Sequence, residues 1–311
     1  MTAATYIPEE GLRFQIVGYY SNKALFAKDG HLGDFDIHRE YDDQWWTLIP
    51  RGDGKYSIKS AYRRSYNKAI YSKWNECGLW DMHDGYDDQY FSIEFGKGDF
   101  EGYARLITLS TDTCLWAGDN SVQNIRASNS NDPQSYFAFY YEDMNVVDIT
   151  YDTTQGSLTA KPDVTITSTV TNDGDTEVKL TADLVRTKST TSSFSRSHGF
   201  SISVNTEITW NVIPTVLSGK VSTDYSTSHT WTVGEDKTDS QTIGTKIEVP
   251  VPKRSKVQVE GAVKSSIIDV PATITLESKT TKTRVKSYAM YRGTAFYDFT
   301  YSVRPAQGIG S

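Results

Sequence analysis

The sequence predicts an all-β protein made of two parts. Helical periodicity is scarce along the 311 residues, and apolar residues recur at every second position more often than at every third or fourth. Turn signals such as Asn172-Asp173-Gly174-Asp175 separate the short runs. The two parts differ in composition, because 27 of the 39 aromatic residues lie in residues 1–150, whereas residues 151–250 contain 36 serines and threonines.

Charge and composition exclude several classes of protein. The net charge of -7 argues against a nucleic-acid binder, since the nearest basic cluster is the short run Lys253-Arg254-Ser255-Lys256. No apolar run is long enough for a transmembrane helix, and two cysteines are too few for a disulfide scaffold. The N-terminal residues have neither a basic start nor an apolar stretch. We therefore expect no signal peptide and a soluble protein, cytoplasmic in the producer or released by a non-classical route.

A threefold repeat organises the first part. Two kinds of segment recur at a spacing of 45 residues. They begin at Asn22, Asn67 and Asp112, and at Asp42, Asp87 and Asp132. Glycine-rich turns between the copies suit connections between strands. Three copies in one register predict three all-β repeats.

Three all-β repeats of this length resemble a β-trefoil, and the Gln-x-aromatic ending of each repeat resembles the signature of ricin-type lectins. The endings are Gln44-x-Trp46, Gln89-x-Phe91 and Gln134-x-Tyr136. The resemblance covers residues 6–141. It implies that these aromatic residues belong mainly to the core and that the loops between strands contact sugar.

Repeats one and two share a set of side chains at equivalent positions. The set is an aromatic residue, an Asp, a His, a Tyr and two further Asp: Phe35, Asp36, His38, Tyr41, Asp42 and Asp43, and then Trp80, Asp81, His83, Tyr86, Asp87 and Asp88. A sugar site needs an aromatic face together with hydrogen-bonding groups for hydroxyls. Repeat three lacks most of the set, so we predict two working carbohydrate sites and one degenerate site. The alternative is a set of solvated loop residues around a packed aromatic side chain.

Residues 200–233 form two amphipathic arms. Apolar residues occupy even positions from Phe200 to Trp210, and mostly odd positions from Leu217 to Trp231. Each arm exceeds the roughly 9–11 residues that a tilted strand needs to cross a bilayer. A transmembrane barrel with one face toward lipid and one toward water requires this alternation. The alternative is a half-buried pair of strands in a β-sandwich.

Residues 211–217, which join the two arms, are apolar, and we predict that they form an insertion tip. A turn in water would normally carry Asn-Gly or Asp-Gly there. The predicted membrane-contacting residues are Trp210, Val212, Ile213, Pro214, Val216 and Leu217. The predicted pore-lumen residues are Glu207, Lys220 and Asp224. They leave one net negative charge per chain, which predicts weak cation selectivity.

The order of features in residues 146–305 resembles the pore module of aerolysin-type toxins. These features include a hairpin with Trp-x-x-x-Pro at Trp210, a strand ending in His229-Thr230-Trp231, and a Pro-x-Arg-Ser-Lys-x-x-Val run at 252–259. With a trefoil before it, the whole chain resembles the fungal haemolytic lectins. The resemblance implies a lectin domain over residues 1–143 and a pore-forming module over residues 144–311. It also implies a galactose-containing surface glycan as ligand, a homo-oligomer, and a β-barrel inserted into the target membrane.

The sequence has no GxSxG, HExxH or Walker A motif, and its five histidines lack the spacing of metal ligands. We expect no catalytic residues, no metal and no cofactor, and hence a protein that is not an enzyme. A trefoil joined to a glycosidase domain is disfavoured because the Ser/Thr-rich part is small for one. The main competing hypothesis is a non-lytic carbohydrate-binding lectin whose β-rich tail only oligomerises.

Overall fold

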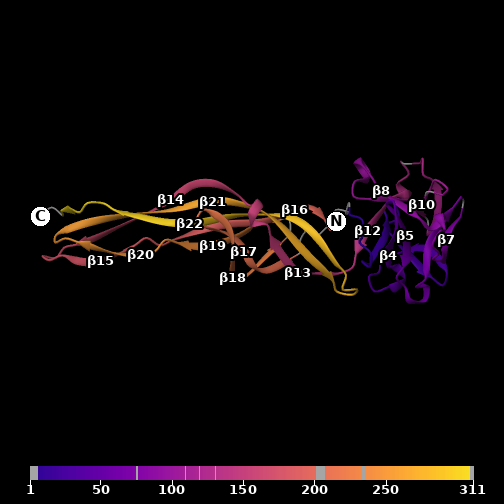
Figure 1. The fold of residues 1–311 in the computed structure, drawn as a ribbon, viewed down its shortest axis with the longest axis horizontal. Helices are drawn as coiled ribbons and strands as arrows, with labels where there is room; N and C mark the ends of the chain where they lie inside the picture. The colour runs from indigo at the N-terminus through magenta and orange to yellow at the C-terminus, as the bar shows by residue number, and fades with distance from the viewer. Residues whose placement is uncertain are drawn as a thin grey trace. The chain divides into compact units, whose positions relative to one another are not determined.

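The computed structural model is all-β, as predicted. It describes residues 6–308 except residues 75, 109, 119, 130, 201–206 and 233–234, and except the side chains of residues 196–198, 207 and 225–228. The chain forms two compact units (Figure 1). The first comprises Met1–Val147, Gly199–Ser201 and Thr275–Lys286, and the second comprises Asp148–His198, Ile202–Ile274 and Ser287–Ser311. Short 3-10 turns lie at Asp42–Gln44 (η1), Arg63–Ser65 (η2), Asp87–Gln89 (η3), Gly98–Phe100 (η4), Pro133–Ser135 (η5) and Thr153–Gln155 (η6).

The strands of the first unit fall into three groups of four. Repeat one has β1 (Phe14–Gly18), β2 (Ala24–Lys28), β3 (His31–Phe35) and β4 (Trp46–Gly52). Repeat two has β5 (Lys55–Ser60), β6 (Lys68–Lys73), β7 (Glu76–Asp81) and β8 (Phe91–Phe95). Repeat three has β9 (Ala104–Thr108), β10 (Thr113–Gly118), β11 (Ser121–Arg126) and β12 (Phe137–Tyr141).

The pairing of these strands is that of a β-trefoil. The first and last strands of each repeat close an antiparallel ring in the order β1, β4, β5, β8, β9, β12 and back to β1. The two middle strands of each repeat form a hairpin, β2-β3, β6-β7 or β10-β11. The predicted fold of this part is therefore confirmed.

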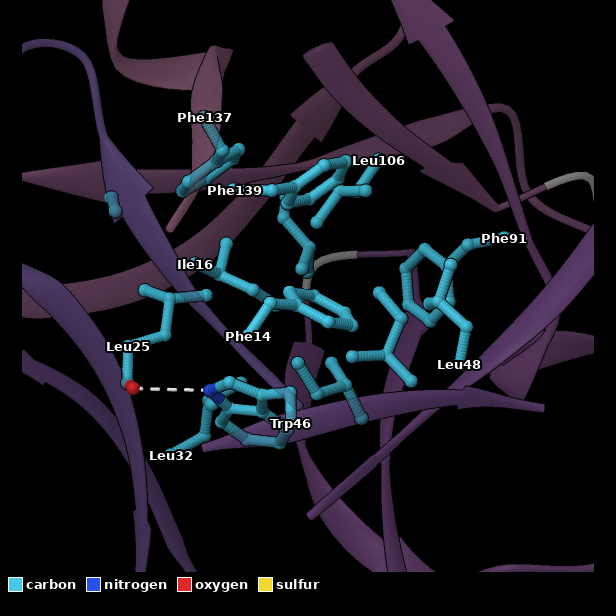
Figure 2. Close-up of a cluster of buried hydrophobic side chains, with 14 of the residues drawn as sticks. Phe14, Ile16, Leu25, Leu32, Trp46, Leu48, Phe91, Leu106, Phe137 and Phe139 are labelled. Atoms are coloured by element: carbon cyan, nitrogen blue, oxygen red, sulfur yellow. Dashed lines mark hydrogen bonds between the residues drawn. The ribbon is translucent and has the colours of Figure 1, made fainter. Parts of the chain in front are cut away.

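The core of the trefoil repeats with the sequence. Leu25, Ile70 and Leu115 lie 45 residues apart and are all fully buried. Trp46 packs among the phenylalanines of the core and donates its indole N–H to the carbonyl oxygen of Leu25 at 3.1 Å (Figure 2). Because a buried indole N–H needs an acceptor, this bond lets a tryptophan occupy the core.

The third repeat departs from the predicted register by one residue. The backbone N–H groups of Trp45 and Tyr90 bond to the carbonyl oxygens of Asp42 and Asp87, and that of Tyr136 bonds to Pro133. Tyr136 is therefore the counterpart of Trp45 and Tyr90. The residue that joins Trp46 and Phe91 in the core is Phe137, which is fully buried. The prediction that Tyr136 holds this position was wrong, because Pro133 follows the strand position of Ile125 by eight residues, whereas Asp42 and Asp87 follow the equivalent Phe35 and Trp80 by seven.

Two buried glutamines fasten the loops that carry the predicted sugar residues. Gln44 accepts from the His38 backbone N–H at 2.8 Å and donates to the Asp36 carbonyl at 2.7 Å. Gln89 repeats both bonds with His83 and Asp81, at 3.0 and 2.9 Å. The equivalent residue in repeat three is a serine, because of the extra loop residue. The loops of repeats one and two thus share one backbone support.

The one-residue offset in repeat three predicts that Gln89 and Gln134 contribute unequally to stability, although the 45-residue spacing makes them equivalent. Gln89→Ala should lower the free energy of unfolding by about 2 kcal/mol, since it leaves a loop N–H and a loop carbonyl without their partner. Gln134→Ala should cost less than about 0.5 kcal/mol. Urea unfolding of the full chain, followed by circular dichroism, measures both. Equal losses would contradict the one-residue offset.

The second unit is built on a long antiparallel sheet. Its strands are β13 (Met144–Tyr151), β14 (Ser157–Asn172), β16 (Arg186–Gly199), β19 (Lys237–Ile243), β21 (Ser255–Ser278), β22 (Arg284–Val303) and β23 (Gln307–Gly308). Strands β21 and β22 run side by side (Figure 1). The 24 residues of β21 extend about 80 Å at about 3.3 Å per residue. The chain also forms two separate two-stranded sheets, β15-β20 and β17-β18.

Residues 252–254 of the run at 252–259 form the turn that leads into β21, and residues 255–259 begin that strand. Strand β15 (Val178–Asp183) pairs with β20 (Lys246–Val251), which ends just before this turn. Asn172 donates to the carbonyl oxygens of Val251 and Pro252, at 2.9 and 3.0 Å. Arg254 has a φ of 46° and lies 2.7 Å from the Asp175 carboxylate. The motif therefore fixes the corner between two sheets.

Candidate functional site

Repeat two carries a hollow of about 220 Å³ beside the β6-β7 hairpin. Its lining combines aromatic rings with charged and amide side chains, namely Tyr71, Lys73, Glu76, Trp80, Tyr86, Asp88 and Gln89. Trp80 is 58% exposed and Tyr86 is 50% exposed, so both rings are available to a ligand. The structure brings together three of the six residues predicted in this repeat, Trp80, Tyr86 and Asp88.

The other three predicted residues of repeat two, Asp81, His83 and Asp87, do not line the hollow. The Asp81 carboxylate is 3.1 Å from the Lys68 ammonium group. The His83 ring packs 4.9 Å from that of Tyr86, and both His83 and Asp87 are exposed. His83 is therefore placed to orient Tyr86.

Repeat one presents a related surface. The ring of His38 lies between Phe35 and Tyr41, with centroid distances of 6.2 and 4.3 Å, and stacks on both. Burial raises the pKa of the half-buried Asp43 carboxyl, and nearby Lys28 partly offsets this rise. Asp42 lies 3.5 Å from Arg13, and Asp36 is exposed. The three rings form one continuous aromatic face.

Four lining residues of the repeat-two hollow were not predicted to bind sugar: Tyr71, Lys73, Glu76 and Gln89, of which Gln89 was predicted only as part of the Gln-x-aromatic ending. Tyr71, Lys73 and Glu76 come from the ends of β6 and β7 rather than from the loop that follows. The Tyr71 hydroxyl donates to Glu76 at 2.7 Å, and burial together with this bond raises the pKa of Tyr71 to about 12. The register that aligned the loops also aligns these positions, so it was the signal that could have found them.

The predicted insertion hairpin is present as β17 (Glu207–Leu217) and β18 (Lys220–Thr232). Residues 201–206 and 233 of the predicted range lie outside the described residues. The turn is Ser218-Gly219, with φ angles of 50° and 72°. Two positive φ angles are what a tight two-residue hairpin turn requires. The prediction that residues 211–217 form the tip was wrong, because they lie within β17 and a Ser-Gly pair makes the turn.

The hairpin has one buried and one exposed face. Cross-strand pairing puts Ile208 with Trp231 and Val216 with Val221 on one face, where Ile208, Val216 and Trp231 are buried. The other face carries Leu217, which is 68% exposed and pairs with Lys220. The prediction that Leu217 shares the face of Val221 was wrong, since a two-residue turn pairs Val221 with Val216 instead.

The other predicted tip and lumen residues divide between the two faces. Pro214 is buried, and Trp210, Val212 and Ile213 are half-buried. Lys220 and Asp224 are exposed, on the side opposite Val221. Glu207 pairs with Thr232, and its side chain lies outside the described part of the chain.

The end of the hairpin near its turn rests on the long sheet through apolar contacts. Val216 and Val221 pack with Ile268 and Val270 of β21 and with Ala295 of β22. The β17-β18 ladder forms its own sheet, separate from the long one. The hairpin can therefore leave the sheet without breaking its own backbone ladder.

The other end is held by an aromatic cluster. Trp231 packs against Phe194 and Tyr291, with centroid distances of 5.3 and 6.3 Å, and donates to the Ser192 hydroxyl at 2.8 Å. Burial raises the pKa of Tyr291 to about 12. Among the described residues, side chains rather than a backbone ladder hold this part of the hairpin against the unit.

Within the described part of the chain, no helix is long and apolar enough to cross a membrane. The same residues contain no group of three His, Cys, Asp or Glu side chains that could hold a metal ion.

Several solved structures are similar to part of this chain. A structure titled BEL β-trefoil is 22% identical, covers 45% of this chain and 99% of its own, and has a TM-score of 0.37. The designed threefold-symmetric protein ThreeFoil is 21% identical, covers 42% of this chain and 99% of its own, and has a TM-score of 0.35. The cytolethal distending toxin of Haemophilus ducreyi is 12% identical, covers 44% and 88%, and has a TM-score of 0.35. No curated protein matches the chain.

The second comparison concerns families. The aerolysin toxin family matches residues 125–307, which is more than half of the chain. This range contains the long sheet, the β17-β18 hairpin and the corner at 252–259. The chain belongs to the aerolysin toxin family.

Proposed function

We propose that this protein is a pore-forming lectin. Its trefoil binds galactose-containing glycans on a target cell, its second unit assembles into a ring of identical chains, and each chain contributes a hairpin to one transmembrane β-barrel. The observation that carries the proposal is the β17-β18 hairpin, which is amphipathic and forms a sheet of its own. Erythrocytes with such glycans are lysed, as the resemblance to haemolytic lectins implies.

The barrel follows from the two faces of the hairpin. Backbone groups in lipid must be paired within a closed ladder, so neighbouring hairpins have to bond to each other all the way around the ring. The face of Ile208 and Val216, now buried against the unit, turns to lipid. The exposed face with Lys220 and Asp224 lines the water-filled lumen.

The glycan sites supply the local concentration that assembly needs. In repeat two the exposed Trp80 ring offers a surface to the C–H side of a sugar, and Asp88 offers acceptor oxygens to its hydroxyls. A second site in repeat one lets a single chain bind two glycans at once, which strengthens attachment to a surface. We propose no catalytic residue and no cofactor.

A disulfide tests the insertion of the hairpin. A Cβ built at Gly156 lies 3.1 Å from the Val221 Cβ, close to the roughly 3.5–4.5 Å of a disulfide. Oxidised Gly156→Cys/Val221→Cys should release no haemoglobin from erythrocytes, because its hairpin is tied to the unit, and reductant should restore release. The two single-cysteine variants are the controls. Lysis by a fully cross-linked protein would refute insertion, and clumping without lysis by the wild type would favour the non-lytic lectin.

Two tryptophans of one hairpin test the glycan site. Trp80→Ala should weaken binding to lactose about tenfold, since it removes the stacking surface. Trp74→Ala should leave binding unchanged, because Trp74 is 69% exposed on the same β6-β7 hairpin but does not line the hollow. Titration of immobilised lactose measures both. A wild type with no affinity for lactose would contradict the proposed ligand.

Reversal potentials measured in planar bilayers under a salt gradient test which residues line the lumen. The wild-type pore should favour cations weakly, because the three predicted lumen residues carry one net negative charge. Lys220→Gln should strengthen the preference for cations, and Asp224→Asn should weaken or abolish it. Identical selectivity in all three proteins would show that these residues do not face the lumen.

A further inference from the structure

The two glycan sites differ at two positions of the hairpins that carry them. Tyr71 and Glu76 of repeat two correspond to Phe26 and His31 of repeat one in the 45-residue register. The pairing confirms the equivalence, because Tyr71 lies opposite Gly78 as Phe26 lies opposite Gly33. The aromatic wall is kept in both repeats, whereas a hydroxyl and a carboxylate are present only in repeat two.

The Tyr71–Glu76 pair adds acceptor oxygens to the hollow. The Tyr71 hydroxyl donates to one oxygen of Glu76 at 2.7 Å, which leaves the other carboxylate oxygen and the phenol lone pairs for a ligand. Asp88 lines the same hollow. Acceptors from two elements beside the Trp80 ring suit a neutral sugar that presents adjacent hydroxyl donors.

The pair is held in place by its neighbours. The Asn124 amide donates to the Glu76 carbonyl at 2.9 Å and to the Ser72 hydroxyl at 2.8 Å. A Cβ at position 78 would lie 3.2 Å from the Tyr71 ring, so Gly78 gives the ring its room. A preorganised group loses less conformational freedom when a ligand binds.

Repeat one cannot reproduce this arrangement. The Phe26 and His31 rings lie 5.9 Å apart and contain no hydroxyl or carboxylate. Asn124, which holds the β6-β7 hairpin, belongs to the next repeat. Its counterpart beside the β2-β3 hairpin is Leu79, 45 residues earlier, whose side chain has no hydrogen-bond donor. Asp29 stands in the place of Trp74, at the turn of that hairpin.

We infer that repeat two is the dominant glycan site and that Tyr71 and Glu76 are binding residues that set its affinity for a neutral sugar with adjacent hydroxyls. The inference rests on the proposed function, because it assigns affinity within a site proposed there. It goes beyond that proposal in ranking the two sites and in naming the pair that separates them.

Lactose binding by conservative variants tests the pair. Tyr71→Phe and Glu76→Gln should each weaken binding about tenfold, the value of one or two lost hydrogen bonds. Tyr20→Phe and Glu101→Gln are matched controls, since both residues are exposed and lie outside the hollow. Trp80→Ala should cost more affinity than Phe35→Ala. Thermal unfolding of each variant checks that the fold is kept.

Transplanting the pair gives the converse test. In the Trp80→Ala background, Phe26→Tyr/His31→Glu should recover at least about threefold of the lost affinity for lactose. Full binding by both single variants, or equal losses from Trp80→Ala and Phe35→Ala, would overturn the inference while leaving the lectin proposal intact. A wild type that does not bind lactose would overturn both. Binding of 3′-sialyllactose as tight as that of lactose would overturn the assignment to neutral sugars.

Discussion

The backbone pairing of β17 with β18 is the constraint on which the second unit depends. A segment destined for lipid has to carry its hydrogen bonds with it, because an unpaired backbone group in hydrocarbon costs several kcal/mol. The hairpin meets this condition, since it forms its own sheet and, among the described residues, contacts the unit through side chains. Under the proposed function, the stored hairpin and the inserted hairpin are two placements of one ladder.

Apolar contacts and one hydrogen bond hold the hairpin against the unit. Val216 and Val221 bury apolar surface against β21, and Trp231 adds one hydrogen bond to Ser192. Trp210 is less well accommodated, because its buried indole N–H has no hydrogen-bond partner among the described residues. An unsatisfied buried donor favours any state in which it finds an acceptor, and in the proposed pore the membrane interface supplies one.

The three repeats of the trefoil share their core residues and differ in exposed residues at the ends of their hairpins. Leu25, Ile70 and Leu115 repeat because the core must close with threefold symmetry. Glu76 and His31 occupy equivalent backbone positions but are different residues. A position at the end of a hairpin does not pack in the core, so its side chain can vary between repeats. The repeats therefore differ most where the fold places no demand on the side chain, and the proposed ligand contacts lie there.

The sequence by itself determined the all-β class, the threefold repeat and the amphipathic hairpin, because all three are periodic and periodicity is written in the order of residues. It also placed Trp80, Tyr86 and Asp88 in one site. Tertiary structure decided the rest. The extra residue before Phe137 shows only in backbone bonding, and the turn at Ser218-Gly219 follows from cross-strand register. Tyr71 and Glu76 meet Tyr86 and Asp88 only after the β6-β7 hairpin folds beside the loop that follows it, so the 45-residue register could align them between repeats but no local pattern could place them in the hollow.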